Sequence, residues 1–186
     1  MPRLVTERLV VRPLTTGDAE ALRLTVEDVH PGWLEWTAAS YEQLAALTQP
    51  PYGERGIELR ETGELAGLVG LVPSMGPFGQ LPGFGGAVGD PARFRPEVGM
   101  FWSLAPPHRG KGYATEAARA VIEHALEALS LARIVATTER DNAASIAVMR
   151  RLGMRVVENP LSEPEWFQVV GWIDAPVQLG SGAEGA

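Results

Sequence analysis

The spacing of apolar residues changes along the chain, and each change predicts a different element of secondary structure. Apolar residues at every second position are typical of strands, whereas spacings of three and four are typical of helices. Ser40 and Gln43 form a capping-box pattern, which predicts that a helix begins there. Before residue 73 the pattern predicts a strand over 4–12, a short helix ending near His30, a helix over 41–48, and a hairpin over 57–72 with its turn at 61–63.

The second half of the chain contains the clearest helical pattern. Apolar residues recur at helical spacing from Ala114 to Leu129, after an apolar strand over 98–104 and a basic turn. The remaining pattern predicts strands over 133–138, 154–157 and 166–173, and a short helix over 142–151. This order predicts an α/β (α+β) fold, a mixed sandwich around a largely antiparallel sheet. We expect one domain over residues 1–175, with a disordered tail over 176–186.

Residues 73–96 follow neither spacing. The segment is rich in glycine and proline and contains Phe78, Phe84 and Phe94. A loop of this length inside a compact domain is usually functional or mobile. Two interpretations stay open: a connection between strands with a large excursion that covers a substrate, or an unstructured insertion.

The composition excludes several classes of function. The 186 residues are 45% hydrophobic and 21% charged, which is ordinary for a soluble globular protein. There are no cysteines, and His30, His108 and His124 show no metal-ligand spacing, so we expect no disulfide and no metal. The net charge of -7 argues against nucleic-acid binding, and no apolar run approaches a membrane span. We expect a cytoplasmic protein; a homodimer is one option for its oligomeric state.

The turn before the long helix is a candidate anion site. Gly110 and Gly112 lack a Cβ, so the backbone can turn sharply and a ligand can approach it closely. Arg109 and Lys111 add positive charge, and the unpaired N–H groups of a helix start attract anions. The turn lacks the Ser or Thr of a Walker A loop and the third glycine of a dinucleotide fingerprint.

Three motifs resemble those of one enzyme family. Residues 109–114, Arg-Gly-Lys-Gly-Tyr-Ala, match the R/Q-x-x-G-x-G/A signature of GNAT acyltransferases, which binds the pyrophosphate of acetyl-CoA. Residues 6–9, Thr-Glu-Arg-Leu, resemble the opening of the ribosomal-protein (Rim-type) N-acetyltransferase branch, and Asn142-x-x-Ser145 followed by residues 151–154 resembles a further element of that branch. The resemblance implies a mostly antiparallel sheet of six to seven strands with about four helices, in which two strands splay apart at the cofactor site.

The resemblance also implies a set of acetyl-CoA contacts. Backbone groups of the glycine turn and helix start would hold the pyrophosphate. The splayed strand over 98–104 would expose backbone groups to the pantetheine arm and the acetyl carbonyl, and its partner would be the strand over 133–138. The cofactor-binding residues expected on this basis are Trp102, Leu104, Arg109, Gly110, Lys111, Gly112, Tyr113, Ala114, Thr115 and Asn142. For Asn142 the alternative is a plain helix N-cap.

Catalysis in the family implies two further residues. Glu97 stands where similar proteins often carry a general base, with a surface carboxylate as its alternative and Glu139 or Asp141 as weaker candidates. The family tyrosine that acts as general acid is replaced here by Met149, which cannot donate a proton. Ser145 resembles the substitute of the Rim-type branch and would hydrogen-bond the departing sulfur.

The resemblance therefore implies transfer of an acetyl group from acetyl-CoA to a primary amine. A protein N-terminal α-amine is one acceptor, and a small-molecule amine such as an amino acid, polyamine or antibiotic is the alternative. A non-catalytic acyl-CoA-binding module also stays open because of the methionine. The acceptor would lie in a groove beside residues 19–48. Its expected walls are Trp33, Trp36, Tyr41 and the segment 73–96, although the pattern of the tryptophans favours the core over a groove.

Overall fold

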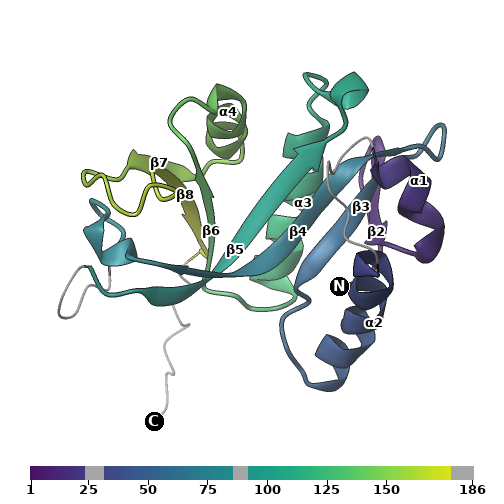
Figure 1. Ribbon diagram of the computed structural model, residues 1–186, viewed down its shortest axis with the longest axis horizontal. Coiled ribbons are helices and arrows are strands. Elements are labelled where there is room, and N and C mark those ends of the chain that lie inside the picture. Colours follow the sequence, from purple (N-terminus) through teal and green to yellow (C-terminus); the bar gives the residue numbers. More distant parts are fainter. Residues whose placement is uncertain (24–31, 86–91, 177–186) are drawn as a thin grey trace, which may run out of the picture.

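A single eight-stranded sheet organises the protein. The computed structural model describes residues 1–23, 32–85 and 92–176 (Figure 1). The sheet order is β1-β2-β3-β4-β5-β6-β8-β7, and every neighbouring pair is antiparallel except β5 and β6. The strands are β1 (Leu4–Val5), β2 (Leu9–Pro13), β3 (Gly53–Leu59), β4 (Leu65–Gly76), β5 (Arg95–Leu104), β6 (Arg133–Thr138), β7 (Arg155–Glu158) and β8 (Val169–Asp174).

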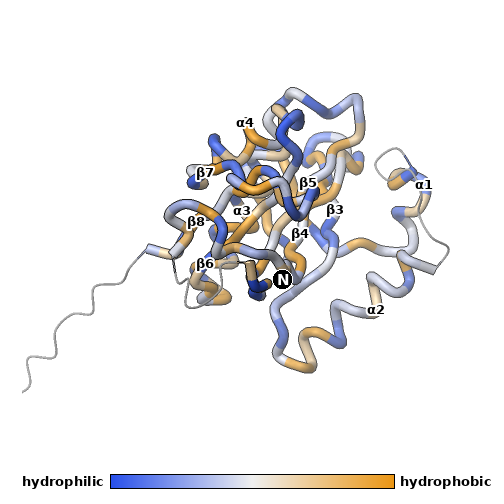
Figure 2. The backbone as a smooth tube through the Cα atoms, turned by 60° about the vertical axis from the view of Figure 1, so that its left-hand side comes forward, coloured by the Kyte–Doolittle hydropathy of each residue, from blue (hydrophilic) through white to orange (hydrophobic). Residues whose placement is uncertain are grey.

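In the described part of the chain, four α-helices cover the sheet: α1 (Ala19–Leu22), α2 (Trp33–Ala46), α3 (Tyr113–Glu127) and α4 (Ala143–Arg151). The main core lies between the sheet and the pair α3 and α4, where Ala117, Ala118 and Val121 of α3 are fully buried. A separate leucine cluster from α1, α2 and β4 includes Leu22 and Leu68 and packs on the other face. Figure 2 shows the hydrophobic stretches gathered in the sheet and along α3 and α4.

The β4–β5 connection forms a third apolar cluster. β4 continues to Gly76, a 3-10 turn spans Phe78–Gln80, and β5 begins at Arg95. Phe78 and Phe84 stack on each other and pack against Phe167 and Trp172, all of them buried. The described part of the segment is thus a connection between strands with a large excursion; residues 86–91 lie outside the described residues.

The mostly antiparallel mixed α/β architecture is confirmed, as is the hairpin over 57–72, but some boundaries differ. The sheet has eight strands because the predicted strand over 4–12 is broken near Thr6 into β1 and β2, whose residues pair with each other. The prediction that a helix begins at Ser40 is wrong. The helix begins at Trp33 after Gly32, whose backbone is left-handed, and the Ser40 hydroxyl donates to the Thr37 carbonyl inside it (2.8 Å).

Two predictions fall partly on residues without a description. The helix expected to end near His30 is seen as α1 only, because residues 24–31 lie outside the described part of the chain. The tail over 176–186 is described at Pro176 alone. In the described ranges, no helix has the length and apolarity needed to cross a membrane, and no group of three or more metal-ligating side chains was found.

Candidate functional site

The central feature of the site is a divergence between β5 and β6. Only one residue pair, Gly99 and Val135, bridges these parallel strands. β5 pairs with β4 over its whole length, and β6 pairs with β8 over its whole length. Beyond the bridge the carboxyl-terminal parts of β5 and β6 therefore separate, as Figure 1 shows, and backbone groups on this edge of β5 are left without a strand partner.

The loop after β5 leads directly into the start of α3. Gly110 (φ 75°) and Gly112 (φ 86°) both adopt left-handed backbone, which side chains with a Cβ rarely tolerate. The Glu116 N–H donates to the Gly112 carbonyl (3.1 Å), closing the first turn of α3. The N–H groups before Glu116 therefore have no acceptor within the helix, and the helix dipole adds partial positive charge at this end. This arrangement suits an anion.

A hydrogen-bonded clamp from the N-terminal strands supports the helix start. The Thr6 hydroxyl and the Arg8 backbone N–H donate to Glu116 Oε1 (2.6 and 2.9 Å), while Arg8 Nε donates to Glu116 Oε2 (2.7 Å). Arg8 Nη1 also donates to the carbonyl of Lys111 (3.0 Å). Partial burial opposes ionisation of Glu116, but the bonds from Thr6 and Arg8 outweigh it and hold its pKa below the usual value. Thr6 and Arg8 thus hold the start of α3, and Arg8 also holds the glycine loop.

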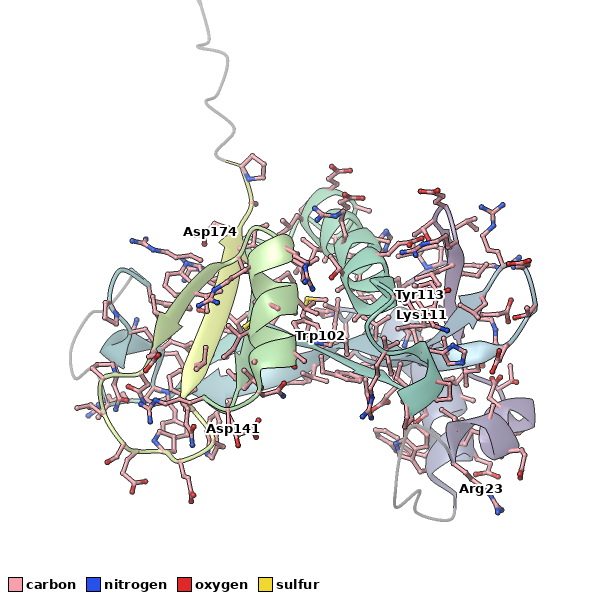
Figure 3. All side chains as sticks on the ribbon, turned by 90° about the horizontal axis from the view of Figure 1, so that it is seen from above. Arg23, Trp102, Lys111, Tyr113, Asp141 and Asp174 are labelled. Atoms are coloured by element: carbon pink, nitrogen blue, oxygen red, sulfur yellow. The ribbon has the colours of Figure 1, made fainter. Side chains whose placement is uncertain are left out.

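A cavity of about 570 Å³ lies between the end of β5, the glycine loop and α4. Nine of the twelve site residues expected from the sequence line it: Trp102, Leu104, Arg109, Gly110, Gly112, Ala114, Thr115, Asn142 and Ser145. Seen from above in Figure 3, Trp102 lies between α3 and α4, with Lys111 and Tyr113 at the start of α3. Residues far apart in the sequence therefore meet around one space.

Three expected site residues do not line this cavity. Lys111 is exposed, and its backbone carbonyl bonds to Arg8. Tyr113 is half-buried beneath the Arg8 guanidinium, whose carbon lies 4.8 Å from the ring centroid, so its ring belongs to the clamp. The third is Glu97, which lies on β5 before the Gly99–Val135 bridge.

Two arginines of the loop and of α4 add positive charge to the cavity. Arg109 donates from Nε to the Leu104 carbonyl (2.9 Å), which ties the loop to the end of β5. Arg151, at the end of α4, lines this cavity and a neighbouring one of about 630 Å³ beside the start of α3. Its carbonyl accepts a hydrogen bond from Arg119 Nη2 (2.7 Å). Arg151 was not among the expected cofactor-binding residues, because its place beside the glycine loop depends on how α4 packs against α3.

Asn142 is the N-cap of α4. Its Oδ1 accepts a hydrogen bond from the Ser145 N–H (3.0 Å), so the capping alternative is realised while the residue also lines the cavity. The cap uses only the amide oxygen and leaves two N–H donors on Nδ2. Met149 is fully buried, and a Cβ on Gly171 of β8 would lie 3.0 Å from its sulfur. No polar group therefore replaces the family tyrosine at this position.

Glu97 is partly enclosed on the face of the sheet opposite α3 and α4. Its side chain is 20% exposed, and Oε1 lies 3.8 Å from Arg133 Nη1. Burial raises the pKa of Glu97 above its usual value, and the charge of Asp174 adds to the rise, whereas Arg133 and Arg95 oppose it. A carboxyl group with a raised pKa is suited to accept a proton near neutral pH. The alternatives, Glu139 and Asp141, are both exposed.

The residues expected to line an acceptor groove have different surroundings. Trp36 is 67% exposed and so does not belong to the core, whereas Trp33 packs against the leucine cluster. The Tyr41 hydroxyl donates to the Glu54 carbonyl and accepts from the Leu14 N–H, so it links α2 to the sheet. Of these three side chains, only that of Trp36 is freely presented to a ligand.

The sequence matches the family model of the acetyltransferase (GNAT) domain over residues 8–155. It is 31% identical over 166 residues to the uncharacterised N-acetyltransferase YoaA of Bacillus subtilis (strain 168), and this match covers 83% of each protein. YnaD, another uncharacterised N-acetyltransferase of that organism, is 42% identical over 59 residues, which make up 32% of this chain and only 34% of YnaD.

Solved structures show the same fold. An acetyltransferase from Agrobacterium tumefaciens str. C58 superposes with a TM-score of 0.65 at 28% identity, covering 93% of this chain and 94% of that one. RimJ of Mycobacterium smegmatis, solved with CoA-disulfide, has a TM-score of 0.59 at 20% identity and covers 94% of this chain and 86% of its own. The structural neighbours thus include Rim-type acetyltransferases, as the sequence motifs predicted. The chain belongs to the GNAT acetyltransferase family.

Proposed function

We propose that the protein transfers the acetyl group of acetyl-CoA to a primary amine, by direct attack of the amine in a complex that holds both substrates. The observation that carries this proposal is the shared cavity. The start of α3, with N–H groups that have no acceptor in the helix, and the free edge of β5 line the same space. The start of α3 suits a diphosphate, and the free edge of β5 suits the amide groups of a pantetheine arm.

Each wall of the cavity has a role in holding the cosubstrate. N–H groups from Gly110 to Thr115 would bind the pyrophosphate, with Arg109 and Arg151 supplying charge at the rim. The Asn142 amide would bind the pantetheine arm through its nitrogen, since its oxygen caps α4. Backbone N–H groups near Trp102 and Leu104 would stabilise negative charge on the acetyl oxygen.

The chemistry requires two proton movements. Glu97 would take one proton from the ammonium group, directly or through water, and the amine nitrogen would then bond to the acetyl carbon. As the carbon–sulfur bond breaks, the nitrogen loses a second proton, to the departing sulfur or to water. The sulfur leaves with the electron pair of that bond. Because the reference pKa of a thiol is about 8.5, the sulfur can leave without full protonation, and a hydrogen bond from Ser145 is sufficient support.

The acceptor class is supported by charge. A net charge of -7 favours a protonated amine or a basic polypeptide N-terminus over an anionic acceptor. We propose a protein N-terminal α-amine first, because structural neighbours include Rim-type enzymes, and a small-molecule amine second. One observation favours a non-catalytic acyl-CoA-binding module: the fully buried Met149 leaves no side-chain acid at the tyrosine position.

A thiol-release assay separates these functions. The protein is mixed with acetyl-CoA and a panel of amines that includes N-terminal peptides, polyamines and aminoglycosides, and release of CoA is followed while calorimetry measures CoA binding. Turnover on one class of amine would identify the acceptor. Binding without turnover on any amine would overturn the enzymatic proposal.

The base is tested with Glu97→Gln, which keeps the shape of the side chain and removes its charge. We expect a fall of about 10²-fold or more in kcat at neutral pH. Glu158→Gln is the matched control, because Glu158 is an exposed carboxylate on β7 that pairs with Arg140 (3.2 Å). A rate for Glu97→Gln equal to that of the control would remove Glu97 from the mechanism.

A further inference from the structure

Charged side chains form a row across three neighbouring strands. Glu97 of β5 and Arg133 of β6 each lie two residues before the bridging pair Gly99 and Val135, so they stand side by side on parallel strands. Arg133 is directly opposite Asp174 in the antiparallel pairing of β6 with β8. Side chains at matching positions of neighbouring strands share one face of the sheet.

The guanidinium of Arg133 is shared unequally between the two carboxylates. Its Nε lies 2.5 Å from Asp174 Oδ1, a short charge-assisted hydrogen bond. Its Nη1 lies 3.8 Å from Glu97 Oε1, which is too long for a hydrogen bond. The guanidinium carbon also lies 4.2 Å from the centroid of the Phe84 ring, a stacking contact that restricts its plane. Arg133 is therefore held toward Asp174, although Glu97 is within its reach.

We propose that Asp174 is a positioning residue, which holds the Arg133 guanidinium off the Glu97 carboxylate and so keeps Glu97 able to accept a proton from the acceptor amine. This inference rests on the base role of Glu97 in the proposed function. Asp174 lies at the far end of β8 from the loop that contains Asp141, as Figure 3 shows, and its side chain is 52% exposed and bonds to Arg133. We assign it no contact with the reacting atoms. Its effect on the reaction passes through Arg133.

The physical reason is that a full salt bridge would make Glu97 a poor base. A carboxylate hydrogen-bonded to a guanidinium holds its charge firmly, and its pKa falls. Among the residues that the structure describes, the charged groups around Glu97 are Arg133 from β6, Asp174 from β8 and Arg95 from its own strand, while β4 presents Ser74 directly opposite. Removing the charge of Asp174 takes away one negative neighbour and frees Arg133 to turn toward Glu97. Both changes lower the pKa of Glu97.

The test is a titration of Glu97 that does not need turnover. The protein is labelled with ¹³C at the glutamate side-chain carboxyl carbon, and Glu97→Gln identifies the signal. We expect Asp174→Asn to lower the pKa of Glu97 by about one unit, and Arg133→Gln to raise it by a similar amount. Arg133→Lys keeps the positive charge but lacks the planar guanidinium group. The pKa of Glu97 in this variant should lie between its values in Arg133→Gln and in the unsubstituted protein.

Either variant alone can overturn the inference. If the pKa of Glu97 is unchanged in Asp174→Asn, the inference is wrong. If Asp174→Asn does not fold, a pKa of Glu97 that does not rise in Arg133→Gln has the same consequence. Glu158→Gln serves again as the control, since it removes a carboxylate without a contact to this row.

Kinetics separates this inference from the proposed function. In a plot of kcat/KM against pH, the pKa of the acidic limb should equal the measured pKa of Glu97 in each variant. If the carbon signal shifts and the limb does not, the coupling stands and the base role of Glu97 fails. If neither shifts, the coupling itself is wrong.

Discussion

The Arg8 guanidinium and the Glu116 carboxylate bind each other across the start of α3, with Arg8 Nη2 2.6 Å and Arg8 Nε 2.7 Å from Glu116 Oε2. The same arginine holds the carbonyl of Lys111 in the glycine loop. Since the first turn of α3 and this loop line the proposed pyrophosphate site, a contact made outside the cavity fixes the geometry inside it. Four predictions follow from the clamp and from the cavity walls.

Replacing the carboxylate of the clamp should weaken both folding and CoA binding. Glu116→Gln removes the negative charge of the carboxylate that accepts hydrogen bonds from Thr6 and Arg8. We expect the free energy of unfolding to fall by about 1–2 kcal/mol, a loss limited by the partial exposure of Arg8. Urea unfolding and calorimetric titration with CoA measure the two effects. Glu127→Gln, at the far end of α3, should change neither by more than about 0.5 kcal/mol; equal losses in both variants would contradict a specific clamp.

The stability that Glu116 contributes should depend on pH. Because the pKa of Glu116 is lower in the folded protein than its ordinary value of 4.5, its contribution is present above that value and is lost as pH falls through the folded pKa. The difference in unfolding free energy between the unsubstituted protein and Glu116→Gln should therefore be constant from pH 6 to 7 and shrink below about pH 4.5. Urea unfolding at a series of pH values measures this difference, and a difference that grows on acidification would reverse the assigned sign.

Gly112 should be needed for CoA binding beyond its effect on stability. Gly112→Ala places a Cβ on left-handed backbone, which costs about 1–2 kcal/mol and displaces the N–H groups of the helix start. Gly63→Ala is a matched control, because Gly63 is left-handed (φ 73°) and has no atom within 4 Å of its would-be Cβ in the β3–β4 turn. Both variants should lose similar stability in urea, but only Gly112→Ala should lose about tenfold or more in CoA affinity. Equal affinities would place the pyrophosphate elsewhere.

Ser145 should affect turnover more than cosubstrate binding. If its hydroxyl supports only the departing sulfur, Ser145→Ala should lower kcat by about tenfold and leave the KM for acetyl-CoA within about twofold. The helix cap is retained in this variant, since Asn142 bonds to the backbone N–H of residue 145. Steady-state kinetics on the acceptor found in the thiol-release assay measures the change. A rise in KM without a change in kcat would make Ser145 a binding residue.

The sequence located the glycine loop and the helix after it, but not the contacts that each loop residue makes. The motif predicts contacts with the cosubstrate for Lys111 and Tyr113. The structure places the Lys111 side chain in solvent and the Tyr113 ring beneath Arg8, so such contacts would be made by their backbone N–H groups. Arg151 is the opposite case: it was not among the expected cofactor-binding residues, yet the fold brings it to the cavity. The local sequence pattern indicates which residues belong to the same element. It does not indicate which side of a loop faces another element.

Two other short-range signals also failed. Ser40 and Gln43 fit a capping box, yet α2 begins seven residues earlier and the Ser40 hydroxyl bonds back within it. Residues 4–12 read as one strand, but Thr6 and Arg8 leave the strand geometry to bind Glu116, more than a hundred residues away. A local sequence pattern contains no information about a hydrogen bond to a residue so distant in the chain.

The sequence by itself determined the local elements that do not need a distant partner: the hairpin over β3 and β4, the strand β5, the left-handed glycines 110 and 112, and the amphipathic helix α3. Their apolar spacing and turn residues are read within a few positions, and the motif on them identifies the family. Only the tertiary structure decided that β5 and β6 meet at a single pair and then separate, and that Glu97, Arg133 and Asp174 form one row. Parallel pairing joins segments far apart in the chain, so its register depends on the packing of the whole sheet and of α3 and α4 against it.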